Sequence, residues 1–431
     1  MSSGRLVLNK YSIERFLPFY CALVVYKNIY NYFVYLFPNF ESLFVLLYNV
    51  VTLLGLVLFV PLAIFVCCNL SKYKKLLPAI IIPLCVIINI AVVICATGDF
   101  SILSRQHVLV LAQGTNDVKG YYFSQLNTWF GNMFTVLVIA VFTSKLETVK
   151  KCLLYGMSII FIPAALMVVL HPEFLGVRQS TVEGSDVVFG GGLWNIGVMG
   201  IGGLGWLGFM LLNYMNKRQR VFVILAICLF AFLGIAGLSR TLILMLILSC
   251  CTYFLIAKKD GRLLTDVLLI FFAVVLFLLV ENDIVESIIS RFNDSTSGTS
   301  NIRWSLWKAY LSHFGEYWLC GAPYGNIYNY YHDVNLHGHN YLPHSAVINF
   351  LARFGLLCAI SYLVLIKNSF ISIRKNELLS KNQIACMRAA FVAYISLAFI
   401  NQTGFTEPIF YVMFGLWLAF YYIVTNGELK S

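Results

Sequence analysis

Long apolar runs recur along almost the whole chain and are separated by short polar gaps. A helix needs about 20 apolar residues to cross a hydrocarbon core of roughly 30 Å. Runs of suitable length and composition fall at 16–36, 43–68, 77–97, 128–143, 152–170, 189–213, 221–238, 240–257, 263–281, 344–366, 384–402 and 407–424. The pattern predicts an all-α polytopic membrane protein with about twelve transmembrane helices, and residues 1–431 read as a single membrane domain.

The polar gaps differ in charge, and the difference predicts a topology. Every second gap carries a basic cluster: Arg5/Lys10/Arg15, Lys72/Lys74/Lys75, Lys145/Lys150/Lys151, Lys217/Arg218/Arg220, Lys258/Lys259/Arg262 and Lys367/Arg374/Lys375/Lys381. Because basic gaps stay in the cytoplasm, both termini are expected there. Residues 282–343, between spans 9 and 10, then form a large, partly helical loop on the periplasmic side.

That loop contains apolar and aromatic side chains at helical spacing, namely Trp304, Trp307, Tyr310, Leu311 and Phe314. Such spacing predicts an amphipathic helix that lies along the membrane surface.

Composition excludes a soluble globular protein, because 60% of the residues are hydrophobic and 11% are charged. The basic residues that give the chain its net charge of +11 cluster between apolar runs, so they indicate membrane topology rather than nucleic-acid binding. The 12 cysteines fall almost entirely in or beside apolar runs, which argues against a disulfide framework.

The basic residues of the predicted outer gaps are mostly arginines: Arg105, Arg178, Arg240, Arg291 and Arg303. Topology requires only positive charge, whereas the planar guanidinium binds phosphate in a bidentate manner. These arginines therefore suit a lipid-linked diphosphate, and the alternative is contact with lipid headgroups or surface ion pairs. Arg240 is singled out because it follows a very short turn and opens an apolar run.

Four histidines, His332, His337, His339 and His344, fall close together before the tenth span. Imidazole transfers protons near neutral pH, and Pro343 suits the start of a helix, so His344 is expected at the membrane face. Arg353, nine residues later, is expected roughly 13 Å deeper along the same helix. A metal site is the rival interpretation, but the spacing matches no zinc pattern, so neither metal nor cofactor is predicted.

The glycine-rich stretch 190–205 contains a Gly-x-Gly-Gly-x-Gly sequence. It lies inside an apolar run rather than after a strand, so close helix packing is expected instead of nucleotide binding.

Four segments together resemble the O-antigen polymerase and O-antigen ligase superfamily. They are Arg178 with Gly190-Gly-Gly-Leu-Trp-Asn195, Ser239-Arg240, Arg303-Trp-Ser-Leu-Trp-Lys-Ala with Leu319-Cys-Gly-Ala-Pro-Tyr-Gly325, and Pro343-His344-Ser345 leading to Gly355-Leu356. Ser345 stands where the family usually has asparagine. A His-Asn pair occurs instead at His339-Asn340, so His339 is the second candidate for the catalytic base.

The resemblance implies metal-independent, inverting glycosyl transfer from an undecaprenyl-diphosphate-linked oligosaccharide at the periplasmic face of a bacterial inner membrane. Arg178, Arg240 and Arg303 would stabilise the diphosphate, His344 would activate the acceptor, and Arg105 would hold the acceptor or the second phosphate. We expect an O-antigen polymerase, with the lipid bilayer and a chain-length regulator as further partners and no nucleic acid.

Two alternatives stay open at this stage. A ligase that hands the glycan to lipid A–core would need the same donor site. A flippase for lipid-linked oligosaccharides would instead predict charges near the bilayer midplane and two related halves of the chain.

Overall fold

The computed structural model describes residues 3–98, 121–172, 192–237, 239–257, 299–333, 339–340, 342–371, 379–400 and 403–426. In its first half the helices are α1 (Ser3–Leu36), η1 (Pro38–Phe40), α2 (Glu41–Cys68), α3 (Leu70–Tyr73), η2 (Lys74–Leu76), α4 (Leu77–Thr97), α5 (Tyr121–Phe142), α6 (Leu146–Leu170), α7 (Gly192–Met199), η5 (Gly200–Gly205), α8 (Trp206–Leu211) and η6 (Leu212–Tyr214). The rest comprises α9 (Lys217–Ala236), α10 (Arg240–Ala257), α13 (Thr299–Ser312), α14 (Phe314–Tyr317), α15 (Tyr324–Asn329), β1 (His332–Asp333), β2 (His339–Asn340), α16 (Ala346–Phe370), α17 (Lys381–Ile400), α18 (Thr403–Thr406) and α19 (Pro408–Thr425).

The described part of the chain confirms the all-α polytopic membrane fold. Nine of its helical segments are long and apolar enough to span a membrane: Pro38–Cys68, Leu70–Thr97, Ser124–Phe142, Leu146–Leu170, Asn195–Tyr214, Lys217–Ala236, Ala346–Phe370, Lys381–Ile400 and Pro408–Thr425. Thr241–Ala257 is a shorter apolar helix at the expected place. The predicted span 16–36 lies in α1, and the predicted span 263–281 lies outside the described residues.

Burial separates central from peripheral helices. Nearly every residue of α19 is buried, whereas α2 exposes a long series of leucines and valines and buries only a few side chains. Apolar side chains on the outside of a soluble bundle would be costly, but lipid accepts them. The order of burial therefore fits a bundle that is surrounded by hydrocarbon.

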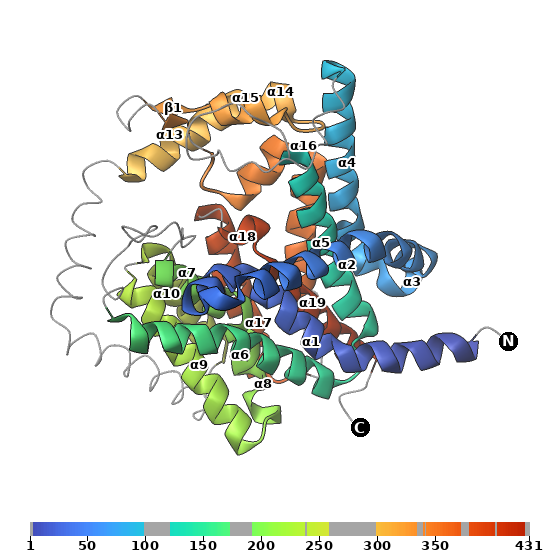
Figure 1. Ribbon diagram of the computed structural model, residues 1–431, viewed down its shortest axis with the longest axis vertical. Coiled ribbons are helices and arrows are strands. Elements are labelled where there is room, and N and C mark those ends of the chain that lie inside the picture. Colours follow the sequence, from blue (N-terminus) through green and yellow to red (C-terminus); the bar gives the residue numbers. More distant parts are fainter. Residues whose placement is uncertain are drawn as a thin grey trace.

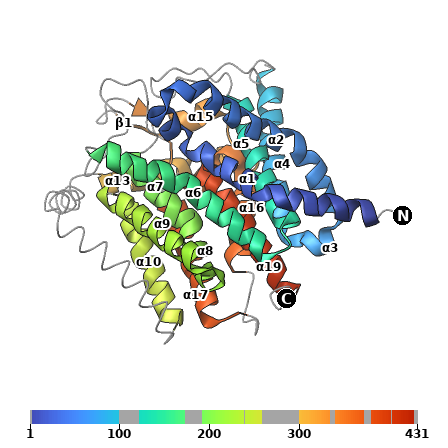
Figure 2. The ribbon, with the colours of Figure 1, turned by 60° about the horizontal axis from the view of Figure 1, so that its bottom comes forward.

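The glycine-rich stretch packs closely against another helix, as its sequence predicts. A Cβ atom on Gly197 would lie 2.5 Å from the backbone nitrogen of Gly234 in α9. Figure 2 shows α7, α9 and α10 lying alongside one another. Residues 200–205 form a π-helical turn, η5, inside this segment.

Several of the predicted cytoplasmic gaps meet in space. The side chain of Asn368, at the end of α16, donates to the carbonyl oxygen of Lys75 at 3.0 Å. In another group, the Lys150 ammonium donates to the carbonyl oxygen of Tyr214 at 3.0 Å, and Gln383 donates to the Tyr214 hydroxyl at 2.7 Å. Different lysine-rich gaps therefore contact one another, as expected if all of them lie on the same side of the membrane.

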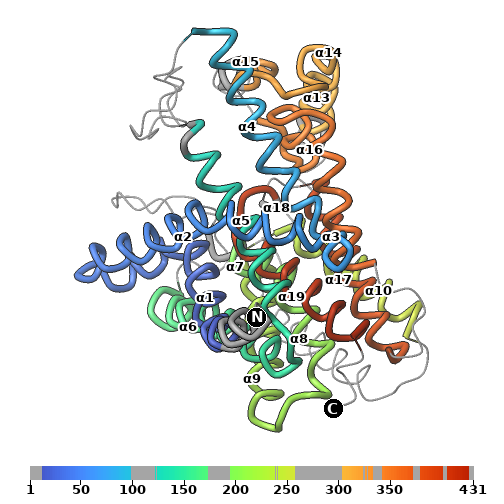
Figure 3. The backbone as a smooth tube through the Cα atoms, turned by 90° about the vertical axis from the view of Figure 1, so that its right-hand side faces the viewer, coloured from blue at the N-terminus to red at the C-terminus, as the bar shows by residue number. Residues whose placement is uncertain are grey.

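At the other end of the molecule, α13, α14, α15 and the short β1–β2 pair form what we call the cap, residues 299–333 and 339–340. Figures 1 and 3 both place the cap at one extreme of the molecule, beyond α16 and α18. Strands β1 and β2 are antiparallel, with His332 opposite Asn340 and Asp333 opposite His339.

Candidate active site

The structure places His344 immediately before α16, in the turn that joins the cap to the bundle. Ser345 is the N-cap residue, and its hydroxyl accepts from the backbone amide of Ile348 at 3.4 Å. Serine favours this position because its side chain satisfies one of the free amides of the first turn. Its presence explains a helix start at Ala346, two residues later than expected, with His344 half-buried just outside the helix.

Asn349 holds the turn on both sides of the histidine. Its side-chain nitrogen donates to the carbonyl oxygen of Pro343 at 2.8 Å and to that of Ser345 at 2.9 Å. The residue is 1% exposed, and its Oδ1 atom is buried without a hydrogen-bond partner in the described part of the chain. A buried amide that donates twice to the residues flanking His344 fixes the backbone from which the imidazole projects.

Helix α16 is broken at Gly355, where φ is 84° and ψ is 176°. The rings of Phe350 and Tyr362 stack with their centroids 4.1 Å apart. In an unbroken helix, residues twelve positions apart lie about 18 Å from each other along the axis. The chain must therefore double back at Gly355, which makes 346–354 a half-helix packed against the rest of α16.

The break bears on the expectation for Arg353. It falls after Arg353, so the rise of roughly 13 Å along the half-helix from His344 still holds. The half-helix doubles back on the rest of α16, however, and does not continue one span in a single direction. Arg353 lies at the end of the half-helix, two residues before the turn at Gly355, and its guanidinium carbon is 5.0 Å from the centre of the Phe405 ring. Arg353 therefore belongs to the packing around α18 rather than to a deeper level of a continuous span.

The break is held by a backbone clasp, which we define as residues 318–322 and 352–356. The amide of Ala322 donates to the carbonyl oxygen of Ala352 at 2.9 Å, and the amide of Leu356 donates to that of Trp318 at 2.7 Å. These two hydrogen bonds join the segment after α14 to the turn in α16.

Glycine is required on both sides of the clasp. Gly321 has φ 80° and Gly355 has φ 84°, in the left-handed region that L side chains rarely adopt. A Cβ atom on Gly321 would also collide with the carbonyl oxygen of Arg353, and one on Gly355 would collide with that of Leu319. The clasp therefore requires glycine for both conformation and space.

The clasp positions α13, which carries Arg303. The cap has its own small core, formed by Leu306, Tyr310, Tyr317, Ala322 and Ile327 together with Ala352 of the half-helix. Within it, the Tyr310 hydroxyl donates to the carbonyl oxygen of Ile327 at 2.8 Å, and the Tyr317 hydroxyl donates to that of Tyr310. The helix expected in the loop is confirmed, and its aromatic residues divide between this core and an exposed face that includes Trp304.

Arg303 and His344 lie close enough to interact electrostatically, although they are 41 positions apart in the sequence. Burial lowers the pKa of the His344 imidazole below its ordinary 6.5, and the positive charge of Arg303 lowers this pKa further. Both effects favour the neutral imidazole at neutral pH. The arrangement thus places a cation near a proton acceptor, and such a cation can stabilise an anion.

The half-helix packs against a cluster of aromatic rings. The Trp129 ring centroid lies 4.8 Å from that of Phe350 and 5.0 Å from that of Phe405, and the latter two are 4.7 Å apart. Large rings in mutual edge and tilted contacts resist displacement, because the close-packed interior leaves little space for movement. The half-helix therefore rests on a rigid support from α5 and α18.

A separate polar trio braces α14 against α15 on the exposed side of the cap. The Glu316 carboxylate pairs with the His313 imidazole at 2.7 Å and accepts from the Tyr330 hydroxyl at 3.0 Å. The hydrogen bond from His313 is the main reason why the pKa of Glu316 is lowered. These groups stiffen the cap and are not part of the His344 site.

The other predicted site residues are only partly described. Arg240 is the first residue of α10, and its side chain lies outside the described part of the structure. The preceding Ser239 is buried, and its hydroxyl accepts from the amide of Leu242 at 3.1 Å, which supports the predicted short turn. His339 is described through its backbone in β2, while Arg105 and Arg178 lie outside the described residues.

Sequence reasoning missed the clasp and the role of Asn349. Asn349 stands in an apolar run, where a single asparagine gives no indication of which carbonyl groups it binds. Asn89 lies within the predicted span 77–97, and the structure shows its partner: its side chain donates to the carbonyl oxygen of Cys320 at 2.9 Å. Gly321 and Gly355 were noted only as parts of the resembling segments.

Part of the chain matches a known protein family. Residues 222–363 match the family model described as O-antigen ligase. The matched range contains Arg240, Arg303 and His344, together with both segments of the clasp. No curated protein matches the chain significantly.

Proposed function

We propose that this chain, which belongs to the O-antigen polymerase and ligase superfamily through residues 222–363, is a polymerase that joins undecaprenyl-diphosphate-linked repeat units. The observation that carries the proposal is that Arg303, from the cap, lies near enough to His344, at the entrance to the half-helix, for its charge to lower the pKa of the imidazole. A cation and a neutral imidazole at one place are the two groups that glycosyl transfer from a diphosphate requires.

The reaction follows from these two groups. The acceptor hydroxyl attacks the anomeric carbon of the donor and transfers its proton to the His344 imidazole. The bond between the anomeric carbon and the diphosphate oxygen breaks, and undecaprenyl diphosphate leaves with the electron pair. Arg303, with Arg240 and Arg178, stabilises the charge that develops on the leaving group. Arg105 is assigned to the acceptor or to the second phosphate.

The site is proposed to face the periplasm of a bacterial inner membrane, with both termini in the cytoplasm. Two contacts between lysine-rich gaps, Asn368 with Lys75 and Lys150 with Tyr214, support this orientation. They bring basic gaps together, and basic gaps remain on the cytoplasmic side. The lipid substrate would reach the site from the outer leaflet, beneath the cap.

A ligase that transfers the glycan to lipid A–core is the second candidate, because the matching family model is described as O-antigen ligase. The donor half of the site would be the same in both enzymes. We favour the polymerase because the His-Asn pair, residues 339–340, stands five residues before His344-Ser345 rather than at that position.

The two candidates are separated by incubating the purified protein with lipid-diphosphate repeat units, with and without lipid A–core. Longer lipid-linked glycans formed without lipid A–core support the polymerase. Transfer that occurs only when lipid A–core is present supports the ligase. Movement of labelled glycolipid across vesicles without any glycan joining would replace both candidates by a flippase.

A further inference from the structure

The junction between the cap and α16 exposes large apolar side chains on the outside of the molecule. Trp318 is 47% exposed and Leu319 is 63% exposed, although both stand in the clasp that holds the active-site region together. A loop surrounded by water rarely presents adjacent large apolar residues beside a functional element.

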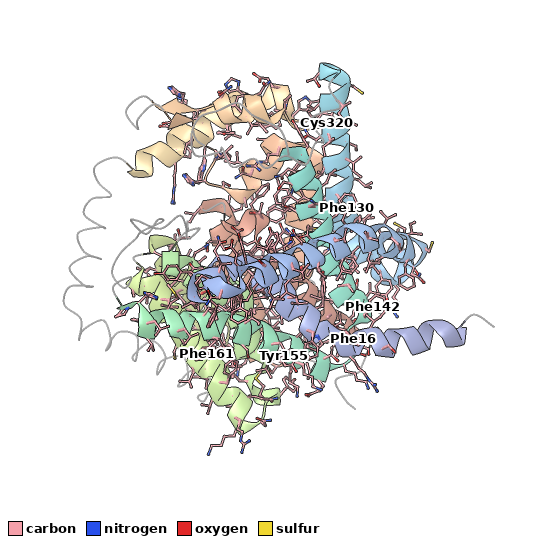
Figure 4. All side chains as sticks on the ribbon, viewed as in Figure 1. Phe16, Phe130, Phe142, Tyr155, Phe161 and Cys320 are labelled. Carbon is pink, nitrogen blue, oxygen red and sulfur yellow. The ribbon has the colours of Figure 1, made fainter. Side chains whose placement is uncertain are left out.

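The clasp lies well inside the apolar length of α4. The Asn89 side chain donates to the carbonyl oxygen of Cys320, so Asn89 and Cys320 stand at the same level of the bundle. Figure 4 labels Cys320 beside α4. Seven apolar residues, 90–96, follow Asn89 before α4 ends at Thr97. At 1.5 Å per residue, the helix extends about 12 Å beyond the clasp.

The exposed surface of the clasp continues that of the neighbouring spans. Leu356, whose amide binds the carbonyl oxygen of Trp318, is followed on α16 by the exposed Leu357 and Ile360. On α4, Ile88 and Val92 are exposed on either side of the level of Asn89. Both helices belong to candidate membrane spans, so lipid is the expected surrounding of these exposed apolar side chains.

The backbone of the clasp is also suited to a hydrocarbon environment. Non-helical backbone is tolerated at membrane depth only where protein satisfies its polar groups. The carbonyl oxygens of Trp318 and Cys320 accept from Leu356 and Asn89, respectively. The amides of Gly321 and Ala322 donate to the carbonyl oxygens of Tyr317 and Ala352.

We propose that Trp318 and Leu319 form an apolar foot that inserts the cap into the outer leaflet, with lipid acyl chains as its partner. The foot sets the depth of the cap and therefore holds Arg303 and His344 near the level at which a lipid-linked diphosphate lies. The membrane contact itself does not depend on the proposed reaction.

The experiment replaces Leu319 with the photo-reactive amino acid p-benzoylphenylalanine in the full-length chain. The protein is reconstituted in vesicles of radiolabelled phosphatidylethanolamine and irradiated without substrate. The same replacement at Leu357, exposed on α16, is the positive control, and replacement at Asn326, exposed on α15, is the aqueous control. We expect a lipid adduct at Leu319 comparable to that at Leu357 and at least about tenfold above that at Asn326.

Two results would contradict the proposal that Trp318 and Leu319 contact lipid. Lipid labelling at Leu319 no higher than at Asn326 would place the clasp in water, and a cross-linked dimer in place of a lipid adduct would identify a second copy of the chain as the partner. If the Leu319 variant does not fold, the replacement at Trp318 provides the same measurement. Since labelling needs no turnover, its failure is distinct from failure of the proposed transferase activity.

Discussion

At the scale of single residues, the neutral state of His344 is produced by its surroundings. Burial and the charge of Arg303 both lower its pKa below 6.5, so the imidazole can accept a proton at neutral pH. The sequence alone indicated both residues, through the proline before the histidine and through the arginine bias of the outer gaps. It could not indicate that they lie near each other, because they are 41 positions apart in the sequence and most of the cap lies between them.

Arg303 should therefore affect the pH profile as well as the rate. The base is lost by protonation as the pH falls through the folded pKa of His344, so the acidic limb of kcat/KM should lie below pH 6.5. Arg303→Ala removes one of the two effects that lower this pKa, and the acidic limb should shift to higher pH. Arg303→Lys retains the charge and should leave the limb near its original position. An acidic limb that does not move in Arg303→Ala would show that Arg303 does not affect the pKa of His344.

Asn349 is expected to act as a positioning residue. Asn349→Ala removes both hydrogen bonds to the residues flanking His344, and misplacement of a catalytic group by about 1 Å can lower the rate about 100-fold. We expect a loss of that order in kcat with little change in KM, measured by steady-state transfer kinetics. Asn368→Ala, at the other end of the same helix, is the matched control and should retain kcat. Equal losses in both variants would indicate general destabilisation instead.

At the scale of elements, the broken α16 determines the site more than any other segment. The run 344–366 is apolar throughout most of its length, so hydrophobic pattern predicts one continuous span there. Pattern alone could not reveal the break, because a glycine inside an apolar helix usually serves close packing. Only the pairing of Gly355 with the segment around Gly321 distinguishes a turn from a packing site, and that pairing is tertiary.

Substitution of Gly355 tests the clasp. Gly355→Ala adds a Cβ atom at φ 84° and ψ 176°, a conformation that costs a residue other than glycine roughly 1–3 kcal/mol, and this atom also collides with the carbonyl oxygen of Leu319. We expect a lower melting temperature and a large loss of transfer activity. Gly315→Ala is the matched control, because a Cβ atom at Gly315, in α14, would have no neighbour within 4 Å in the described structure. Equal behaviour of the two variants would mean that the break does not need the clasp.

At the scale of the whole molecule, the sequence predicted the architecture well where long apolar runs alternate with basic gaps. The helices that are long enough to span a membrane coincide with these runs, and the lysine-rich gaps meet one another through Asn368, Lys150 and Gln383. The cap was predicted as a partly helical loop, but its attachment to the bundle was not. That attachment depends on two glycines, on Asn89 and on a few carbonyl groups, which leave no periodic signal in the sequence.

The most direct test of the transferase centre is the single-turnover rate of the purified protein with lipid-diphosphate repeat units. His344→Ala should lower this rate by about 10²–10⁴-fold, as expected for loss of a general base, while His332→Ala, at an exposed position in β1, should leave it unchanged. Both variants should be extracted from the membrane in amounts similar to the unmodified protein. A wild-type rate in His344→Ala would contradict the assignment, and an inactive His339→Ala beside it would transfer the role of base to His339.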